Sequence, residues 1–179
     1  MGLDIRAFSK LVKIDDIADI EEWEEKYWMN DNDGTALVSD TMMDYTDKIW
    51  PGRTEGLAPS VYRVDGEKFH FRAGSYGGYN RWREWLAQLF LDAQPRTVWA
   101  NPGKYQDKPF IELIEFSDSE GLIGPVVSAK LSDDFQKGQA RVNAYVNADS
   151  HWEGWVRAQY AQWRRAFELA ADSGLVDFY

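Results

Sequence analysis

The chain has 179 residues, a length typical of one domain, and 44% of them are hydrophobic, which is ample for a packed core. A net charge of −10 argues against general binding to nucleic acids, because such binding depends on clustered Lys and Arg. The absence of Cys excludes disulfides, thiolate metal sites and cysteine nucleophiles.

No stretch approaches the roughly 20 consecutive apolar residues that cross a bilayer. Residues 1–10 lack the apolar run of a secretory signal. We therefore expect a cytoplasmic protein that does not interact with membranes.

The negative charge is concentrated in one segment. Between Asp15 and Lys48 there are 12 acidic and 2 basic residues, so the rest of the chain carries 18 of each sign. An acidic surface of this kind can bind a basic partner, repel nucleic acid or imitate DNA. The alternative is a solvated surface that keeps the protein soluble. As partner-binding residues we assign Glu21, Glu22, Glu24 and Glu25.

Residues 3–14 alternate between apolar and polar side chains and shift phase at Phe8, which predicts a strand with a bulge. Apolar residues recur at helical spacing over 16–28, which predicts a helix. The pattern is lost over 29–60, where we expect an irregular region with one short extended piece at 35–39.

Two runs rich in β-forming residues, 60–64 and 67–72, flank Asp65-Gly66, which is a favoured pair for a tight hairpin turn. Alternation along such a hairpin gives it two faces. The apolar face would carry Tyr62, Val64, Phe69 and Phe71, and the polar face would carry Arg63, His70 and Arg72.

A glycine-rich turn over 73–80 then leads into a helix over 81–91, whose apolar residues follow the spacing of a buried face. Its glycines would let backbone N–H groups approach an anion, and the helix N-terminus would add positive partial charge. Arginine, histidine and tyrosine side chains around the turn would supply counter-charge and stacking surfaces. The predicted ligand-binding residues are His70, Arg72, Gly74, Ser75, Tyr76, Gly77, Gly78, Tyr79, Asn80 and Arg81.

This turn suits a phosphate, a nucleotide or a cyclic nucleotide. It matches neither the P-loop pattern nor the dinucleotide-binding pattern. Glycines between a strand and a helix more often serve backbone geometry, so a purely structural turn is the alternative.

Residues 109–117 form a nearly continuous apolar run and predict a central strand. A helix is expected from Gly124-Pro125 to Gly138, because Pro suits a first helical turn and Gly suits a helix end. A capping box of Ser150 and Glu153 predicts the start of a last helix that ends at Gly174, and residues 175–179 predict a short edge strand.

These elements do not alternate regularly, which favours an α+β fold over a doubly wound sheet. We expect a single domain over 1–179, with a small, mostly antiparallel sheet and three or four packed helices. The acidic and partly irregular region covers about 15–59.

Carboxylates follow the predicted strand at 109–117. Asp118 and Glu120 are candidate ligands for a divalent metal, because hard cations bind carboxylate oxygens. Turn or capping chemistry is the alternative for this segment. No other cofactor is expected.

Three runs, FRAGSYGGYNRWREWLA, PFIELIEFSDSEGLIGPVVSAKLSDDF and RRAFELAADSGLVDF, resemble a group of small uncharacterised proteins encoded by phages, prophages and related bacterial loci. The opening GLDI is also similar to their N-termini. No catalytic residue carries over, because the group has no established activity. The resemblance implies an accessory role in the host cytoplasm.

We therefore expect a binding protein that captures a host protein or a small anionic, nucleotide-like ligand, for instance to counter a host defence. The alternative is a metal-dependent enzyme acting on a phosphorylated or nucleotide substrate, with His70 as its acid or base. A third hypothesis is a structural or assembly module.

Overall fold

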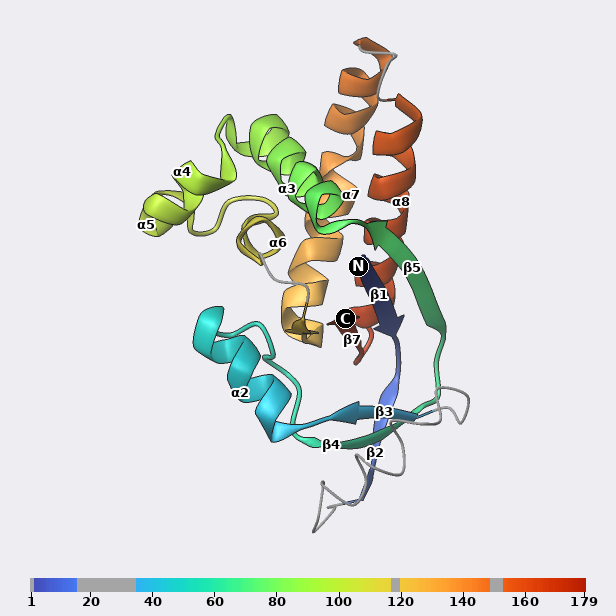
Figure 1. Ribbon diagram of the computed structural model, residues 1–179. Coiled ribbons are helices and arrows are strands. Elements are labelled where there is room, and N and C mark those ends of the chain that lie inside the picture. Colours follow the sequence, from blue (N-terminus) through green and yellow to red (C-terminus); the bar gives the residue numbers. More distant parts are fainter. Residues whose placement is uncertain (1, 16–34, 117–119, 149–152) are drawn as a thin grey trace.

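Two small antiparallel sheets and seven helices make up the computed structural model, which describes residues 2–15, 35–116, 120–148 and 153–179 (Figure 1). The mixed α+β architecture is as predicted, although the described residues form more helices than the three or four expected. The first sheet has the strand order β5 (Lys68–Gly74), β1 (Leu3–Phe8), β7 (Leu175–Phe178), β6 (Gly121–Ile123). The second has the order β2 (Leu11–Asp15), β4 (Ser60–Val64), β3 (Thr35–Val38).

Two segments of the chain, one containing β1 and β2 and the other containing β4 and β5, run through both sheets. β1 pairs with β5 in the first sheet, and β2 pairs with β4 in the second. Both segments bend where they pass between the sheets, and Lys10 has a φ of 53° at this point. The predicted single strand over 3–14 is therefore two strands in two sheets.

The prediction of a tight hairpin at Asp65-Gly66 is wrong, because β4 and β5 do not pair with each other. β4 pairs with β2 and β3, whereas β5 pairs with β1. The turn contacts the bend in the facing segment, where the Lys10 carbonyl oxygen accepts a 3.1 Å hydrogen bond from the Asp65 N–H. A Cβ on Gly66 would lie 2.6 Å from the carbonyl oxygen of Ser9. The glycine therefore permits a close backbone approach between two bends.

The predicted alternation holds in β5 but not in β4, where Ser60, Val61 and Tyr62 are all buried. Phe71 and Ala73 are buried, while His70 and Arg72 are exposed. Tyr62 and Phe71 nevertheless belong to two separate hydrophobic clusters, because their strands lie in different sheets.

α8 (Glu153–Ala170) packs against the first sheet and against α7 (Pro125–Ala148) (Figure 1). The predicted apolar face of α8 is buried, and it carries Val156, Tyr160, Trp163, Phe167 and Ala170. Gly138 does not end α7: an added Cβ there would lie 2.7 Å from the Tyr160 hydroxyl oxygen. This glycine lets two helices approach closely.

The region expected to be irregular contains regular structure. The extended piece predicted at 35–39 is confirmed as β3. It leads into α2 (Asp40–Ile49), where the Ser39 hydroxyl accepts a 3.2 Å hydrogen bond from the Met42 N–H and caps the helix. The helix predicted over 16–28 lies outside the described residues.

The central strand predicted over 109–117 is wrong, because these residues form a short helix, α6 (Ile111–Glu115). Phe110 begins it with a left-handed φ of 62°, and its N–H donates a 2.8 Å hydrogen bond to Asp134 on α7. A short apolar run fits a buried strand and a buried helix equally well.

Two further short helices, α4 (Pro95–Ala100) and α5 (Pro102–Tyr105), follow α3 (Tyr76–Leu91) and precede α6. β7 is a strand as predicted, but it lies between β1 and β6 rather than at an edge. In the parts of the chain that the structure describes, no helix has the length and apolar character needed to cross a membrane.

Candidate functional site

The predicted glycine-rich turn is the first part of α3. The Ser75 hydroxyl accepts a 3.1 Å hydrogen bond from the Gly78 N–H, and the Ser75 carbonyl accepts one of 2.9 Å from the Tyr79 N–H. Ser75 is therefore the N-cap, and Tyr76, Gly77 and Gly78 are helical. Gly74 precedes the cap with a φ of 106°, a conformation that favours glycine.

The side chains predicted to bind a ligand lie in different surroundings. Tyr79 is 2% exposed and stacks on Trp163, so its ring belongs to the core. Arg72 Nη1 lies 3.1 Å from Asp4 Oδ2, and its guanidinium packs over Gly2. His70 and Arg81 are exposed, and His70 faces Arg6 across the sheet. The ligand-binding role of this turn stays a prediction.

The other predicted sites fall largely outside the described residues. Asp118 and the acidic residues Glu21, Glu22, Glu24 and Glu25 lie in the undescribed ranges, whereas Glu120 is exposed. No group of three His, Asp or Glu side chains that could hold a metal occurs within the described ranges. The metal site also stays a prediction.

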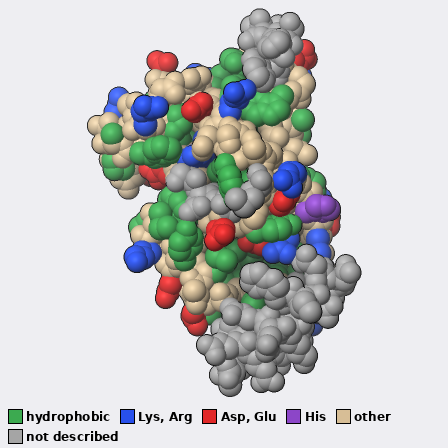
Figure 2. Space-filling view, viewed as in Figure 1, with side chains coloured by type: hydrophobic (Ala, Val, Ile, Leu, Met, Phe, Trp, Pro, Cys, Tyr) green, Lys and Arg blue, Asp and Glu red, His purple; other side chains and the backbone are tan. Residues whose placement is uncertain are grey.

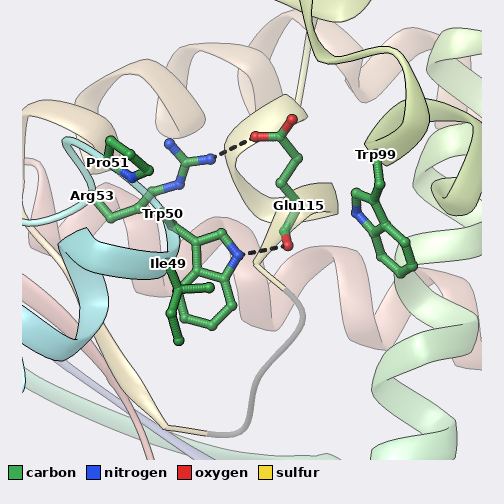
Figure 3. A pocket seen from close by; sticks show the side chains of 6 residues that line it. All are labelled: Ile49, Trp50, Pro51, Arg53, Trp99 and Glu115. Atoms are coloured by element: carbon green, nitrogen blue, oxygen red, sulfur yellow. Dashed lines mark hydrogen bonds and ion pairs between the residues drawn. The ribbon is translucent and has the colours of Figure 1, made fainter.

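A cleft of about 340 Å³ opens between the end of α2, the helix α4 and the end of α6. Its volume is at the lower end of the range for small-molecule sites, and it is a shallow hollow that is largely open to solvent. In the space-filling view the outline is indented on the left, between the part formed by α4 and α5 and the part formed by α2 (Figure 2). The cleft contains none of the predicted ligand-binding residues. It is lined by Ile49, Trp50, Pro51, Arg53, Trp99 and Glu115 (Figure 3).

An ion pair lies in the lining of this cleft. Arg53 Nη2 donates a 2.9 Å hydrogen bond to Glu115 Oε2, and the two side chains are only 10% and 25% exposed. The Nε atom of Arg53 is fully buried and has no hydrogen-bond partner in the described part of the chain. Such a pair interacts more strongly than one at an open surface, because less water screens it.

Hydrogen bonds to the backbone carbonyl groups at the end of α6 fix the position of Glu115. The carbonyl oxygens of a final helical turn have no partner within the helix. Here Trp50, which directly follows α2, and two side chains from α3 donate to three successive carbonyl oxygens. Trp50 Nε1 donates to Glu115 at 3.0 Å, Arg83 Nη1 to Ile114 at 3.0 Å, and the Tyr79 hydroxyl to Phe116 at 2.7 Å.

The aromatic wall of the cleft is Trp99, which is 43% exposed. Arg83 Cζ lies 5.0 Å from the centre of the Trp99 ring and 5.2 Å from that of Tyr79, within the range of cation–π contacts. Burial lowers the pKa of Arg83, but an arginine stays charged at neutral pH. The buried Arg83 therefore packs against the Trp99 ring, and the exposed part of that ring gives the cleft an apolar surface.

Sequence reasoning did not find this cleft. Trp50 and Arg53 lie in the region that was expected to be irregular, and Trp99 lies between two predicted elements. Long irregular regions are often functional, which was the available signal for the first two residues. Glu115 lies within the run over 109–117 that was predicted to be a strand.

No protein-family model matches the chain, and no curated protein or solved structure matches it either.

Proposed function

We propose that the protein binds a small, planar, anionic ligand of the nucleotide type in the cleft between α2, α4 and α6, and that it acts by binding rather than by catalysis. The observation that carries this proposal is the exposed ring of Trp99 in the same 340 Å³ cleft as the ion pair of Arg53 and Glu115. Apolar walls with a few convergent polar groups are typical of ligand sites.

The planar part of the ligand would stack on Trp99. Stacking of a nucleobase on an aromatic side chain contributes roughly 1–3 kcal/mol. The cation–π contact with Arg83 restrains the Trp99 ring before a ligand arrives, which reduces the entropy lost on binding. Ile49 and Pro51 supply further apolar surface in the lining.

The lining of the cleft is electrically neutral although the whole chain is acidic. It contributes one charge of each sign, from Arg53 and Glu115, and Arg83 behind Trp99 lies near the negative charge of Glu84. A phosphate in the cleft would therefore bind through Arg53 itself rather than through a general positive field. We expect binding to weaken as ionic strength rises.

The biological setting that we propose rests on the resemblance to phage-encoded proteins. A binding protein made in an infected cell can counter a host defence by sequestering a nucleotide on which that defence depends. A second candidate is capture of a basic host protein by the acidic segment. The charge concentrated between Asp15 and Lys48 favours this second function.

A calorimetric and thermal-shift screen with nucleoside monophosphates and cyclic nucleotides tests the cleft. A ligand at about 100 times its dissociation constant stabilises the fold by ~2.7 kcal/mol. We expect Trp99→Ala to abolish the shift and Arg72→Ala to preserve it. The converse pattern would assign the ligand to the glycine-rich turn, and no shift with any compound would refute small-ligand binding.

A further inference from the structure

The strand β5 has a paired neighbour on one side only. It lies at the end of the strand order in the first sheet and pairs there with β1, so within the described ranges its other side is an open edge (Figure 1). The strand is seven residues long. An open edge carries backbone N–H and C=O groups that can bond to a strand from another chain.

The hydrogen bonds of β1 show which residues of β5 direct these groups outward. Asp4 exchanges two backbone hydrogen bonds with Tyr179, of 2.9 and 3.1 Å, so its backbone groups point away from β5. Backbone groups alternate in direction along a strand, so those of the next residue, Ile5, point toward its partner Phe71. The residues of β5 whose backbone groups point to the open edge are therefore Lys68, His70 and Arg72.

The same three residues carry basic side chains, and all three are exposed. Lys68 makes no ion pair with any part of the chain that the structure describes. The Arg72 side chain is 60% exposed although it pairs with Asp4. On the opposite face of the strand, Phe69 is only partly buried and packs against the main hydrophobic cluster. The open edge therefore has basic groups on one face and apolar surface on the other.

Pairing of two copies of the chain through this edge is unfavourable. In an antiparallel pair centred on His70, Lys68 of one copy would lie opposite Arg72 of the other, and like charges in opposite positions destabilise a sheet. A strand with carboxylates at these positions would replace the repulsion by attraction. We propose that the edge of β5 binds an acidic, extended segment of a partner protein, which adds a strand to the first sheet.

The geometry of the edge defines the sequence pattern of this segment. Residues opposite Lys68, His70 and Arg72 exchange backbone hydrogen bonds with them and carry their carboxylates on the same face of the sheet. The residues between them point to the other face, where apolar side chains contact Phe69. None of these residues lines the cleft between α2, α4 and α6, so binding at the edge is independent of ligand binding in the cleft.

Fluorescence anisotropy of labelled peptides, titrated with the whole chain, tests the proposal. The probes are a peptide of alternating Glu and Val, its counterpart of Lys and Val, and the Glu-Val peptide with methyl groups on the Glu backbone nitrogens. We expect the first to bind at least about tenfold more tightly than the second, and methylation to abolish binding. Equal binding of the Glu and Lys peptides, or no binding, would overturn the proposal. Undiminished binding of the methylated peptide would also overturn it, because no strand would then form.

A pair of variants separates the edge from general charge. Lys68→Gln combined with Arg72→Gln should weaken the Glu-Val peptide severalfold. The matched control, Arg96→Gln combined with Lys104→Gln, removes two charges from exposed positions on α4 and α5 and should bind as the wild type does. Equal weakening by both variants, at wild-type thermal stability, would contradict a role of the edge. Self-association of the chain that the first variant abolishes would assign the edge to a second copy instead.

Discussion

The hydroxyl of Tyr79 donates a 2.7 Å hydrogen bond to the carbonyl oxygen of Phe116, and this bond joins the beginning of α3 to the end of α6. Tyr79 was predicted to face a ligand, but its ring is buried in the core. The residue nevertheless affects the cleft, because it fixes the helix end on which Glu115 is placed. The predicted turn and the observed cleft are thus connected through one side chain.

Alkaline pH should destabilise the protein through its buried tyrosines. Burial raises the pKa of Tyr79 and of Tyr160 above the ordinary value of 10.0. The unfolded chain ionises these groups above about pH 10, whereas the folded chain keeps them neutral. Their contribution to stability is therefore complete below about pH 10 and is lost as the pH rises toward the folded-state values.

Urea unfolding between about pH 8 and pH 11 measures this effect, with Tyr79→Phe as the test variant. At about pH 8 the variant should lose about 1 kcal/mol, because the hydrogen bond to Phe116 is removed. Its stability should then fall less steeply above pH 10 than that of the wild type. Parallel pH profiles would show that Tyr79 ionises as readily in the folded as in the unfolded chain.

The close approach of α7 and α8 depends on Gly138. Gly138→Ala should destabilise the fold by roughly 1–3 kcal/mol, because its Cβ would lie 2.7 Å from the Tyr160 hydroxyl and 2.9 Å from the Phe90 ring. Gly154→Ala in α8 is the matched control, since its Cβ would meet no atom within 4 Å. The control should be neutral or slightly stabilising, because Gly154 lies in the first turn of α8 rather than in its interior. Equal thermal unfolding of the two variants would contradict this packing.

The glycines of the predicted ligand turn should respond differently to alanine. Gly74 has a φ of 106°, so Gly74→Ala should lose about 1 kcal/mol or more through backbone strain. Gly77 is helical, and its Cβ would make only an ordinary 3.7 Å contact with the Ser75 hydroxyl. Gly77→Ala should therefore be neutral or slightly stabilising in urea unfolding. A large loss at Gly77 would be inconsistent with a helix that begins at Tyr76.

The acidic segment can be tested without changing the described core. Replacing Glu21, Glu22, Glu24 and Glu25 by Gln removes four negative charges and should strongly reduce capture of a basic host protein in pull-down experiments. Ligand binding in the cleft should be preserved. Undiminished capture by the neutralised variant would count against the acidic segment as a docking surface.

Local patterns predicted the elements whose structure depends on near neighbours in the sequence. The helical spacing of apolar residues located α3 and α8, and β-forming runs located β4 and β5. Strand pairing was not predictable in the same way, because the partners of Asp65 and Gly66 lie more than fifty residues away at Ser9 and Lys10. A turn signal shows that the chain bends but does not show which strand lies beside it.

The cleft could not be predicted for a related reason. Its lining comes from three short segments, around Trp50, Trp99 and Glu115, and no single segment has the spacing of a known motif. Their convergence depends on the side chains that bind the carbonyl groups of α6, and α6 itself was expected to be a strand. Because residues 109–117 were predicted to be a strand, the sequence did not indicate that Glu115 would lie at a helix end beside Trp50 and Arg53.

The position of β7 between β1 and β6 has a consequence for synthesis on the ribosome. β1 leaves the exit tunnel first, but its neighbour β7 follows only after residue 174 has been translated. Until then β1 and β6 each present an open edge, and open edges invite pairing with other chains. During that interval we expect these open edges to be the parts of the nascent chain that are most prone to mispairing.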